Sequence, residues 1–412
     1  MSPTQPLAMA PPAAATSTAA RDRRPGLSGM DRAALERWLV DNGQPGFRAR
    51  QIHDALWSAT ATGPSDVTTL PRSMDAILDA AFRWSTVADD TVVLADGGQT
   101  EKALHRLSDG ATVESVLMHY PARRGQKARH TLCISSQAGC AVGCPFCATG
   151  ELGFTRDLET AEILDQVRSA VGRLARREDG ARLTNIVFMG MGEPLLNLDR
   201  VLEAVAALND PTRLGLGARH ITVSTSGVVP GIRRLTALGP QFTLAISLHA
   251  ARDPLRDVLV PLNRRWPVAE VVAAAREHAR KTGRRISYEV TMIGGVNDTD
   301  ADADAIATLL RGDLAHVNLI PMNPVAHTPW TASPMPVIEA FAARLTAVGI
   351  PVTIRRNRGQ EIGAACGQLA AEHAGQPAAR AVAWRRQRLE AASARALLGE
   401  RSDEPVPAGV EG

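Results

Sequence analysis

The sequence has little cysteine, little net charge and no long apolar run. Only five of its 412 residues are cysteine, which fits a reducing cytoplasm better than a disulfide-stabilised scaffold. No apolar run is long enough to cross a bilayer, so we expect a cytoplasmic protein without a membrane partner. The net charge of +3 excludes a polycationic coat protein, although the basic residues are locally clustered.

The two ends of the chain are predicted to lie outside the folded part. Residues 1–27 are rich in alanine, proline, serine and threonine and can bury little apolar surface, so we expect a disordered tail. Prolines interrupt this segment and no apolar stretch follows a basic start, which argues against a signal peptide. Residues 371–412 are predicted to form a helix, about 380–398, and a polar tail.

Three of the five cysteines stand close together, Cys140, Cys144 and Cys147, with the spacing C-x3-C-x2-C. Three thiolates can hold three irons of a cubic [4Fe–4S] cluster and leave the fourth iron open. A structural zinc site would need a fourth ligand at short spacing, and the nearest candidates, His130 and Cys133, lie upstream. The motif therefore predicts a cluster with one open iron.

An open iron is a site for a ligand, and S-adenosylmethionine (SAM) can fill it through its amino and carboxylate groups. A reduced cluster can then cleave SAM and release a 5′-deoxyadenosyl radical. In this spacing the sequence resembles the radical SAM superfamily. Phe146, inside the motif, is expected either to pack on the SAM adenine or to shield the cluster from water.

From residue 131 onward, short apolar segments alternate with helical patterns. Six segments rich in valine, isoleucine, leucine and threonine are typical of buried parallel strands: 131–135, 185–189, 221–224, 242–247, 286–292 and 317–321. The helix after the last of them is expected to have Ser333 as its N-cap and Pro334 as its first residue. An extra strand at 352–355 follows.

Six βα units are too few for a closed eight-stranded barrel. They predict an α/β fold whose core, residues 126–370, is a radical SAM partial (β/α)6 barrel. A small helical accessory domain is expected over residues 28–98, and a β-hairpin with a basic connection over residues 99–125. Four basic residues between Pro121 and His130 are candidates for contacts to RNA phosphates: Arg123, Arg124, Lys127 and Arg129.

Polar residues gather after the predicted strands of the barrel. The cysteine motif follows the first strand, and Gly-Met-Gly-Glu-Pro at 190–194 follows the second. Other polar residues end later strands: Ser224, Ser247, His249 and Asn323. Because ligands bind at the carboxyl ends of parallel strands, these residues predict one shared site. Taken alone, His249 is equally compatible with a structural core histidine.

These motifs resemble the RlmN/Cfr family of radical SAM RNA methyltransferases over about residues 30–375. Two lone cysteines, Cys133 and Cys366, add to the resemblance, although each alone would be read as a buried thiol. The segments that carry it are 46–52, 131–137, 190–194, 224–227, 247–249, 318–324 and 358–369. The segment at 46–52, Gly-Phe-Arg-Ala-Arg-Gln-Ile, favours the RlmN branch.

The resemblance implies methylation of adenine C2 in the peptidyl-transferase centre of 23S rRNA and at tRNA position 37, next to the anticodon. This carbon is a poor nucleophile and a poor acid, so a radical route suits it. Cys366 is implied to carry the methyl group as S-methylcysteine, Glu114 to accept the C2 proton, and Cys133 to resolve the enzyme–RNA bond through a transient disulfide with Cys366. Each turnover is implied to use one [4Fe–4S] cluster and two SAM molecules.

The same resemblance assigns the SAM contacts and the partners. The implied SAM contacts are Gly192, Glu193, Ser224, Ser247, Leu248, His249 and Asn323. A flavodoxin- or ferredoxin-type electron donor and a thiol reductant are implied, and we expect a monomer. Three alternatives stay open: Cfr-like methylation at adenine C8, another radical SAM reaction without RNA, and a non-catalytic RNA-binding or redox-sensing module.

Overall fold

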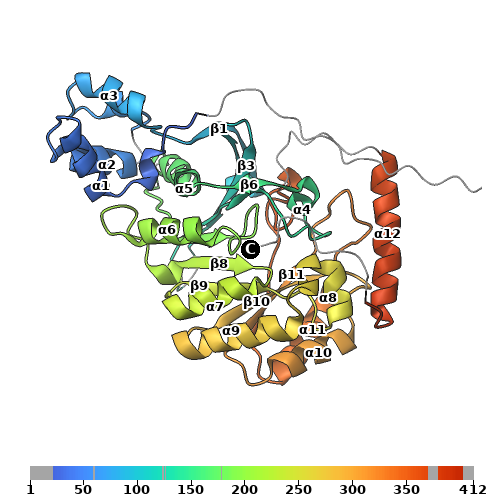
Figure 1. Ribbon diagram of the computed structural model, residues 1–412. Helices are drawn as coiled ribbons and strands as arrows, with labels where there is room; N and C mark the ends of the chain where they lie inside the picture. Colours follow the sequence, from blue (N-terminus) through green and yellow to red (C-terminus); the bar gives the residue numbers. More distant parts are fainter. Residues whose placement is uncertain are drawn as a thin grey trace, which may run out of the picture.

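The computed structural model describes residues 22–58, 61–122, 125, 127–177, 179–369 and 379–401. Ten strands form one sheet, in the order β1-β2-β3-β4-β7-β8-β9-β10-β11-β12. The strands from β1 to β4 pair antiparallel, and those from β4 to β12 pair parallel. Figure 1 shows this sheet curving through the molecule with helices outside it.

The parallel strands follow one another in the chain and in the sheet. They are β4 (Arg129–Cys133), β7 (Asn185–Phe188), β8 (Ile221–Thr225), β9 (Thr243–Ser247), β10 (Ile286–Met292), β11 (Ala315–Pro321) and β12 (Val352–Ile354). The six predicted core strands and the extra strand are confirmed, with ends shifted by one or two residues. Branched apolar side chains fill these strands because both faces of the sheet are covered.

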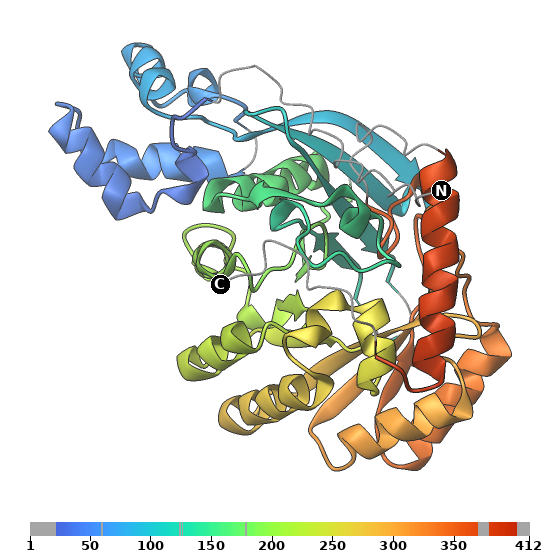
Figure 2. The same cartoon turned by 45° about the vertical axis from the view of Figure 1, so that its right-hand side comes forward.

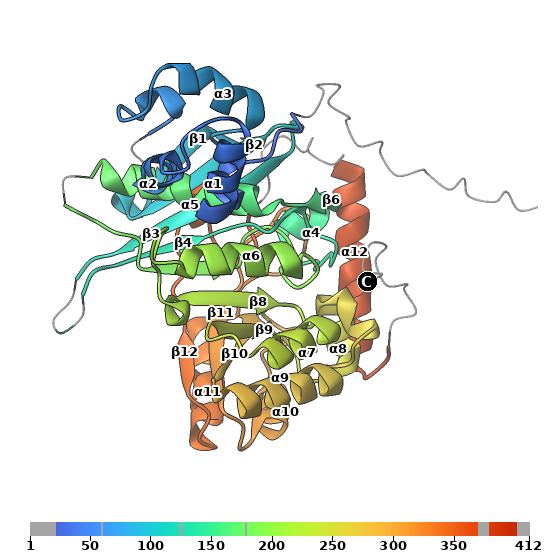
Figure 3. The same cartoon turned by 60° about the vertical axis from the view of Figure 1, so that its left-hand side comes forward.

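Helices connect the parallel strands and cover their outer side, as Figure 3 shows for α6, α7, α9 and α10. These helices are α5 (Thr160–Ala175), α6 (Leu198–Asn209), α7 (Val229–Leu238), α8 (Asp253–Leu259), α9 (Val268–Thr282), α10 (Asp300–Leu310) and α11 (Met335–Ala347). Short 3-10 turns precede β8 and α9, at η4 (Ala218–His220) and η5 (Pro261–Arg264). The result is the predicted partial (β/α)6 barrel.

One prediction about α11 is wrong. Ser333 was expected as its N-cap, but the helix begins at Met335 and Pro334 is the N-cap residue. Pro334 has φ −57° and ψ 142°, which is an extended conformation, so the helical hydrogen bonding starts one residue later.

The barrel stays open because β12 does not pair with β1 among the described residues. The segment after β12, with the 3-10 turn η6 (Gln360–Ile362), crosses this opening to the antiparallel strands. The backbone N–H of Gly359 donates to Asp96 Oδ2 at 3.0 Å, and Arg358 Nη1 donates to the carbonyl oxygen of His119 at 3.0 Å. This segment carries Cys366, so the crossing brings that cysteine over the barrel interior.

The antiparallel strands are β1 (Val87–Ala95), β2 (Thr100–Leu107) and β3 (Thr112–Tyr120), with η3 (Asp96–Gly98) between the first two. The hairpin turn predicted after β2 is confirmed. A strand at β1 was not expected, since residues 28–98 were predicted to be helical. Its conformation depends on pairing with β2 along its length, which is not a local property of the sequence. The division of the chain into domains stays a prediction.

Three helices precede β1: α1 (Arg32–Asp41), α2 (Arg48–Ser58) and α3 (Ser73–Ala81), with short turns at η1 (Leu27–Gly29) and η2 (Pro64–Asp66). The side chain of Asp31 caps α1 by accepting from the N–H of Ala34. In Figures 1 and 2 these helices lie on the opposite side of the molecule from the C-terminal helix α12 (Ala379–Leu397). No helix among the described residues is long and apolar enough to cross a membrane.

Arg168 on α5 joins the N-terminal helices to the barrel. Its buried guanidinium donates to the carbonyl oxygens of Leu56 at 3.0 Å and Trp84 at 2.9 Å, and pairs with Asp165 at 2.6 Å. The other carboxylate oxygen of Asp165 accepts from the N–H and the hydroxyl of Thr86, both at 2.7 Å. One charged pair therefore satisfies three backbone groups, which come from α2 and from the segment just before β1.

The substitution Arg168→Met should destabilise the protein by about 3–5 kcal/mol, because it leaves the buried Asp165 carboxylate without its cation. Denaturant unfolding followed by circular dichroism measures this loss, and limited proteolysis should show earlier cleavage within residues 22–86. Arg176→Met, at the exposed end of the same helix, is the matched control and should unfold like the parent. Equal unfolding of both variants would contradict this role of Arg168.

Candidate active site

The cysteine motif lies on a loop that leaves the barrel after β4. A small two-stranded sheet, β5 (Gln137–Gly139) with β6 (Phe154–Asp157), and the helix α4 (Ala148–Leu152) frame this loop. The N–H of Cys140 donates to Gly153, and Cys147 is the N-cap residue of α4. All three cysteines line one cavity together with Gly192, Glu193, Ser224, Ser247, His249 and Asn323. The structure thus gathers the predicted motif and most of the predicted SAM contacts around one space.

The loop suits an iron–sulfur cluster better than a zinc ion. The described residues contain no group of three or more potential ligands placed to share one metal ion, which a zinc site requires. A cubic cluster has no such requirement, because each thiolate binds a different iron. His130 lies on β4, where its Nδ1 forms a 2.8 Å hydrogen bond with His119, and it does not line the cavity of the cysteine motif. Burial raises the pKa of Cys140 to about 12.

Two glycines let the chain after β7 pass close to the start of the cysteine loop. A Cβ on Gly190 would lie 2.7 Å from the carbonyl group of Ile134, and one on Gly192 would lie 2.5 Å from the side chain of Gln137. Gly192 also has a φ of +98°, which side chains other than glycine rarely adopt. The Gly-Met-Gly segment therefore brings its backbone against the loop that carries the cysteines.

Glu193 ties two of the strand-end loops together. One of its buried carboxylate oxygens accepts from the N–H and the hydroxyl of Ser226, at 2.7 and 2.8 Å, and the other accepts from the N–H of Leu195 at 3.0 Å. Burial raises the pKa of this carboxyl, while these hydrogen bonds oppose the rise. Glu193 lies in the cavity wall, and its predicted contact to SAM stays a prediction.

His249 adopts an unusual backbone conformation at the cavity wall. Its φ is +58°, and Asn297 donates to its carbonyl oxygen at 2.8 Å. The ring accepts the N–H of Thr291 at Nδ1 and packs on Phe146 with a centroid distance of 4.6 Å. Burial lowers the pKa of His249 to about 3, so the ring is neutral and Nε2 carries the proton. The ring is thus held as a hydrogen-bond donor at the cavity, unlike a histidine buried in the core.

Sequence reasoning missed Arg256, on α8. Its fully buried guanidinium donates to the carbonyl oxygens of Ser226, Ser247 and Leu248 at 2.6, 3.1 and 3.0 Å. These carbonyls end two neighbouring strands, so one side chain holds both loops. Leu248 itself is fully buried and does not line the cavity. Its only signal in the sequence is an arginine between Leu255 and Asp257 in a short helical segment.

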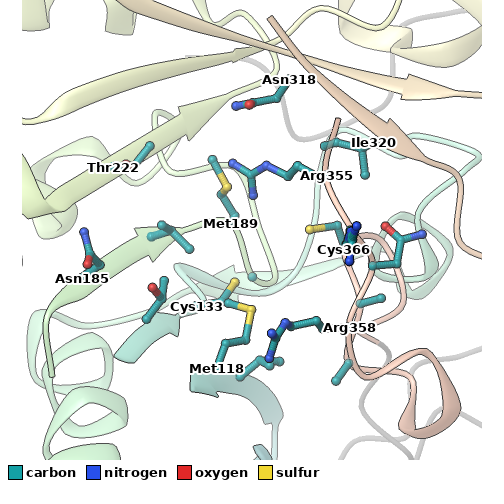
Figure 4. A pocket seen from close by; sticks show the side chains of 18 of the residues that line it. Met118, Cys133, Asn185, Met189, Thr222, Asn318, Ile320, Arg355, Arg358 and Cys366 are labelled. Carbon is teal, nitrogen blue, oxygen red and sulfur yellow. The ribbon is translucent and has the colours of Figure 1, made fainter. Parts of the chain in front are cut away.

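A second cavity, of about 720 Å³, lies inside the barrel. Cys133, at the end of β4, and Cys366, after η6, both face it, and Figure 4 shows their side chains pointing into the same space. Burial raises the pKa of Cys133 to about 12, and Arg355 opposes the rise. Burial also raises the pKa of Cys366, and Arg355 opposes that rise too. One guanidinium therefore offsets part of the effect of burial on both thiols, whose pKa values stay raised.

Cys366 lies at the junction of the two cavities, because it lines both of them. Its loop is fixed from two sides. Asn323 donates to the carbonyl oxygen of Cys366 at 2.9 Å, and the N–H of Ala148 donates to Gly367 at 2.6 Å. The chain is thus arranged so that the Cys366 thiol is open to the cysteine-motif cavity on one side and to Cys133 on the other.

Glu114 lies on β3, behind the wall of the second cavity. Its side chain is fully buried and pairs with Lys102 of β2 at 3.1 Å. Val116 and Met118, on the same face of the strand, line the cavity. The carboxyl group thus has a cationic neighbour within the buried part of the sheet. Lys102 had no signal in the sequence, and the role of Glu114 stays a prediction.

Comparison with known proteins identifies the family. The model of the radical SAM superfamily matches residues 134–309. A probable dual-specificity RNA methyltransferase RlmN from Parafrankia sp. (strain EAN1pec) is 52% identical over 342 residues, which is 80% of this chain and 87% of the relative. The protein of the same name from Salinispora tropica is 48% identical over 350 residues, 84% of this chain and 92% of the relative. This chain belongs to the RlmN family.

A solved structure supports the same assignment. A radical SAM methyltransferase from Sphaerobacter thermophilus is 46% identical, with a TM-score of 0.81, and the match covers 84% of this chain and 100% of that one. The chain is therefore a radical SAM RNA methyltransferase, and its family implies SAM and a [4Fe–4S] cluster as cofactors. The predictions of family, fold and enzyme class are confirmed.

The substitution Gly190→Ala should weaken SAM binding at least about tenfold, or about 1.4 kcal/mol, because the new methyl group must displace the loop from Ile134. Calorimetric titration of the reconstituted enzyme with SAM measures the affinity. Gly63→Ala, where the nearest atom to the added Cβ is 3.9 Å away, is the control. Unchanged affinity in the Gly190 variant would show that this close approach does not shape the SAM site.

Proposed function

We propose that this enzyme methylates C2 of an adenosine in the peptidyl-transferase centre of 23S rRNA and of adenosine 37 in tRNAs, with Cys366 as the methyl carrier. The observation that carries the proposal is the position of Cys366 between two cavities. A group attached to its sulfur can be loaded from the cavity that the cysteine motif lines and delivered in the cavity that Cys133 lines. The names of the relatives, which are RNA methyltransferases of dual specificity, agree with two RNA substrates.

Three residues, Cys140, Cys144 and Cys147, would hold the [4Fe–4S] cluster. With a second SAM bound beside it, this group supplies a 5′-deoxyadenosyl radical. The polar cavity wall at Gly192, Ser224, Ser247 and His249 would orient SAM, with the Nε2–H of His249 as a donor. Phe146 covers one side of this histidine and limits the access of water.

The chemistry assigned to the chain begins with the Cys366 thiolate, which takes the methyl group of a first SAM. The methyl group then loses a hydrogen atom to the radical, and the carbon-centred radical on Cys366 adds to C2 of the adenine. Glu114 accepts the C2 proton. The sulfur of Cys133 bonds to the sulfur of Cys366 as the bond between that sulfur and the RNA-bound methylene breaks. The methylene takes up the thiol proton of Cys133 and becomes the methyl group, and the unpaired electron of the adduct leaves to a one-electron acceptor, for which the cluster would serve. Arg355 supports both thiolates.

The cycle ends with an oxidised pair of cysteines. Two electrons and two protons from a thiol reductant restore Cys133 and Cys366. The electron that reduces the cluster comes from a second donor of the flavodoxin or ferredoxin type. Both reductants are part of this proposal and follow from the electron balance of the reaction.

Incubation of the anaerobically reconstituted enzyme with SAM should add one methyl group to Cys366. Mass spectrometry of the peptide that contains Cys366 detects this group before any RNA is present. Cys133→Ala is the control and should accept the same methyl group, because Cys133 acts only after RNA has reacted. An unmodified Cys366 in protein that still cleaves SAM would exclude the methyl-carrier route. Nucleoside analysis of the RNA product then distinguishes C2 from C8.

The variant Cys133→Ala should accumulate a covalent enzyme–RNA adduct, because no thiol remains to release the methylated base. A denaturing gel with end-labelled RNA measures the adduct as a shifted band. The double variant Cys133→Ala, Cys366→Ala should show none, since it lacks the carrier. Full turnover by Cys133→Ala without a shifted band would remove Cys133 from the mechanism.

A further inference from the structure

The second cavity has a strongly basic lining. Five of its lining residues are basic, and none of the described lining residues is acidic: the basic residues are Lys127, Arg129, Arg355, Arg356 and Arg358. They come from β4 with the segment before it and from the segment after β12, which are far apart in the sequence. Arg355 is paired with Glu289 at 3.7 Å, whereas the other four have no carboxylate partner among the described residues. Such a concentration of positive charge attracts an anion.

Tyr120 organises two of these cations. The guanidinium carbon of Arg129 lies 4.2 Å from the centre of its ring, and that of Arg358 lies 4.4 Å from it. Each contact is within the range of a cation–π interaction. The ring therefore holds two positive charges close together. These charges repel each other unless an anion binds between them.

Most N–H donors of these two arginines have no acceptor within the described part of the chain. Arg358 uses Nη1 to bind Gln99 Oε1 at 3.2 Å and the carbonyl oxygen of His119 at 3.0 Å, while its Nε and Nη2 have no acceptor within the described part of the chain. Arg129 has no hydrogen-bonded acceptor and no carboxylate partner there. Other arginines differ, since Arg156 and Arg173 are each paired with two carboxylates.

We propose that Arg129 and Arg358, held by Tyr120, bind a backbone phosphate of the RNA next to the adenosine that enters the cavity. We call these three residues the phosphate clamp. The proposal rests on the function proposed above and adds the residues that hold its RNA substrate. Arg358 also anchors the Cys366 segment to β3, so the clamp and the methyl carrier share one support.

A phosphate contact explains how one site can serve two RNAs. Contacts to the backbone position a nucleic acid without reading its sequence, whereas rRNA and tRNA differ around the target base. The planar guanidinium groups suit phosphate because they present paired donors. Arg123 and Arg124, which the sequence also suggested as phosphate contacts, lie outside the described residues.

The test compares Arg129→Gln with Arg280→Gln in the full-length reconstituted enzyme. Arg280 is exposed at the end of α9, where its charge adds to that of Lys281 beside Glu277, and it does not line the cavity, so its variant loses the same charge elsewhere on the protein. The probes are an unmodified tRNA transcript and a transcript of the peptidyl-transferase region of 23S rRNA. Affinity is measured over a series of salt concentrations, together with kcat and KM for methylation and the extent of Cys366 methylation without RNA.

We expect Arg129→Gln to weaken binding of both RNAs about three- to tenfold and to lower the slope of log K against log salt by about 0.7–0.9, the value for one lost phosphate contact. KM should rise more than kcat falls. Tyr120→Leu should show the same pattern and Tyr120→Phe should restore the parent values, because the ring rather than the hydroxyl holds the cations. Arg280→Gln should match the parent.

Two results would overturn the clamp. The first is a salt slope and affinity of Arg129→Gln equal to those of Arg280→Gln. The second is loss of Cys366 methylation in Arg129→Gln, which would mean that Arg129 supports the fold of the site. Failure of the proposed function would give another result, because the parent enzyme itself would then methylate neither RNA. The affinities and salt slopes of the variants would still test the clamp in that case.

Discussion

The structure depends on the way the segment after β12 is held across the open side of the barrel. A partial barrel leaves one edge unpaired, and this segment covers it with hydrogen bonds to η3, β3, α4 and the loop after β11. Most of these hydrogen bonds use backbone groups of the segment itself, so they fix the path of its chain rather than the position of one side chain. This path places Cys366 between the two cavities.

The two cavities differ in how their polar groups are used. Around the cysteine motif, buried charged groups are paired with the backbone: Arg256 binds carbonyl oxygens, and Glu193 binds N–H groups. Such pairs hold loops still, as a cofactor site requires. In the cavity that Cys133 lines, Arg129 and Arg358 keep free donors. That arrangement suits a large anionic substrate that must enter and leave in every cycle.

Electrostatics also separate the roles of the titratable groups. Arg355 stands near both non-cluster cysteines and opposes the effect of burial on their thiols. Lys102 of β2 forms an ion pair with the buried Glu114 of β3. His249 is kept neutral by burial and by the neighbouring Arg256. Each of these groups thus has a charged neighbour that only the fold supplies.

The sequence by itself determined the rhythm of strands and helices, the cysteine spacing and the set of motifs at the strand ends. These are local patterns of apolar residues, glycines and ligand spacings, which the chain displays without folding. The tertiary structure alone decided that β1 is a strand, that Lys102 meets Glu114, that Arg256 holds two loops, and that Tyr120 gathers two arginines. Those features join residues far apart in the chain, and no local pattern carries the information about which of them meet.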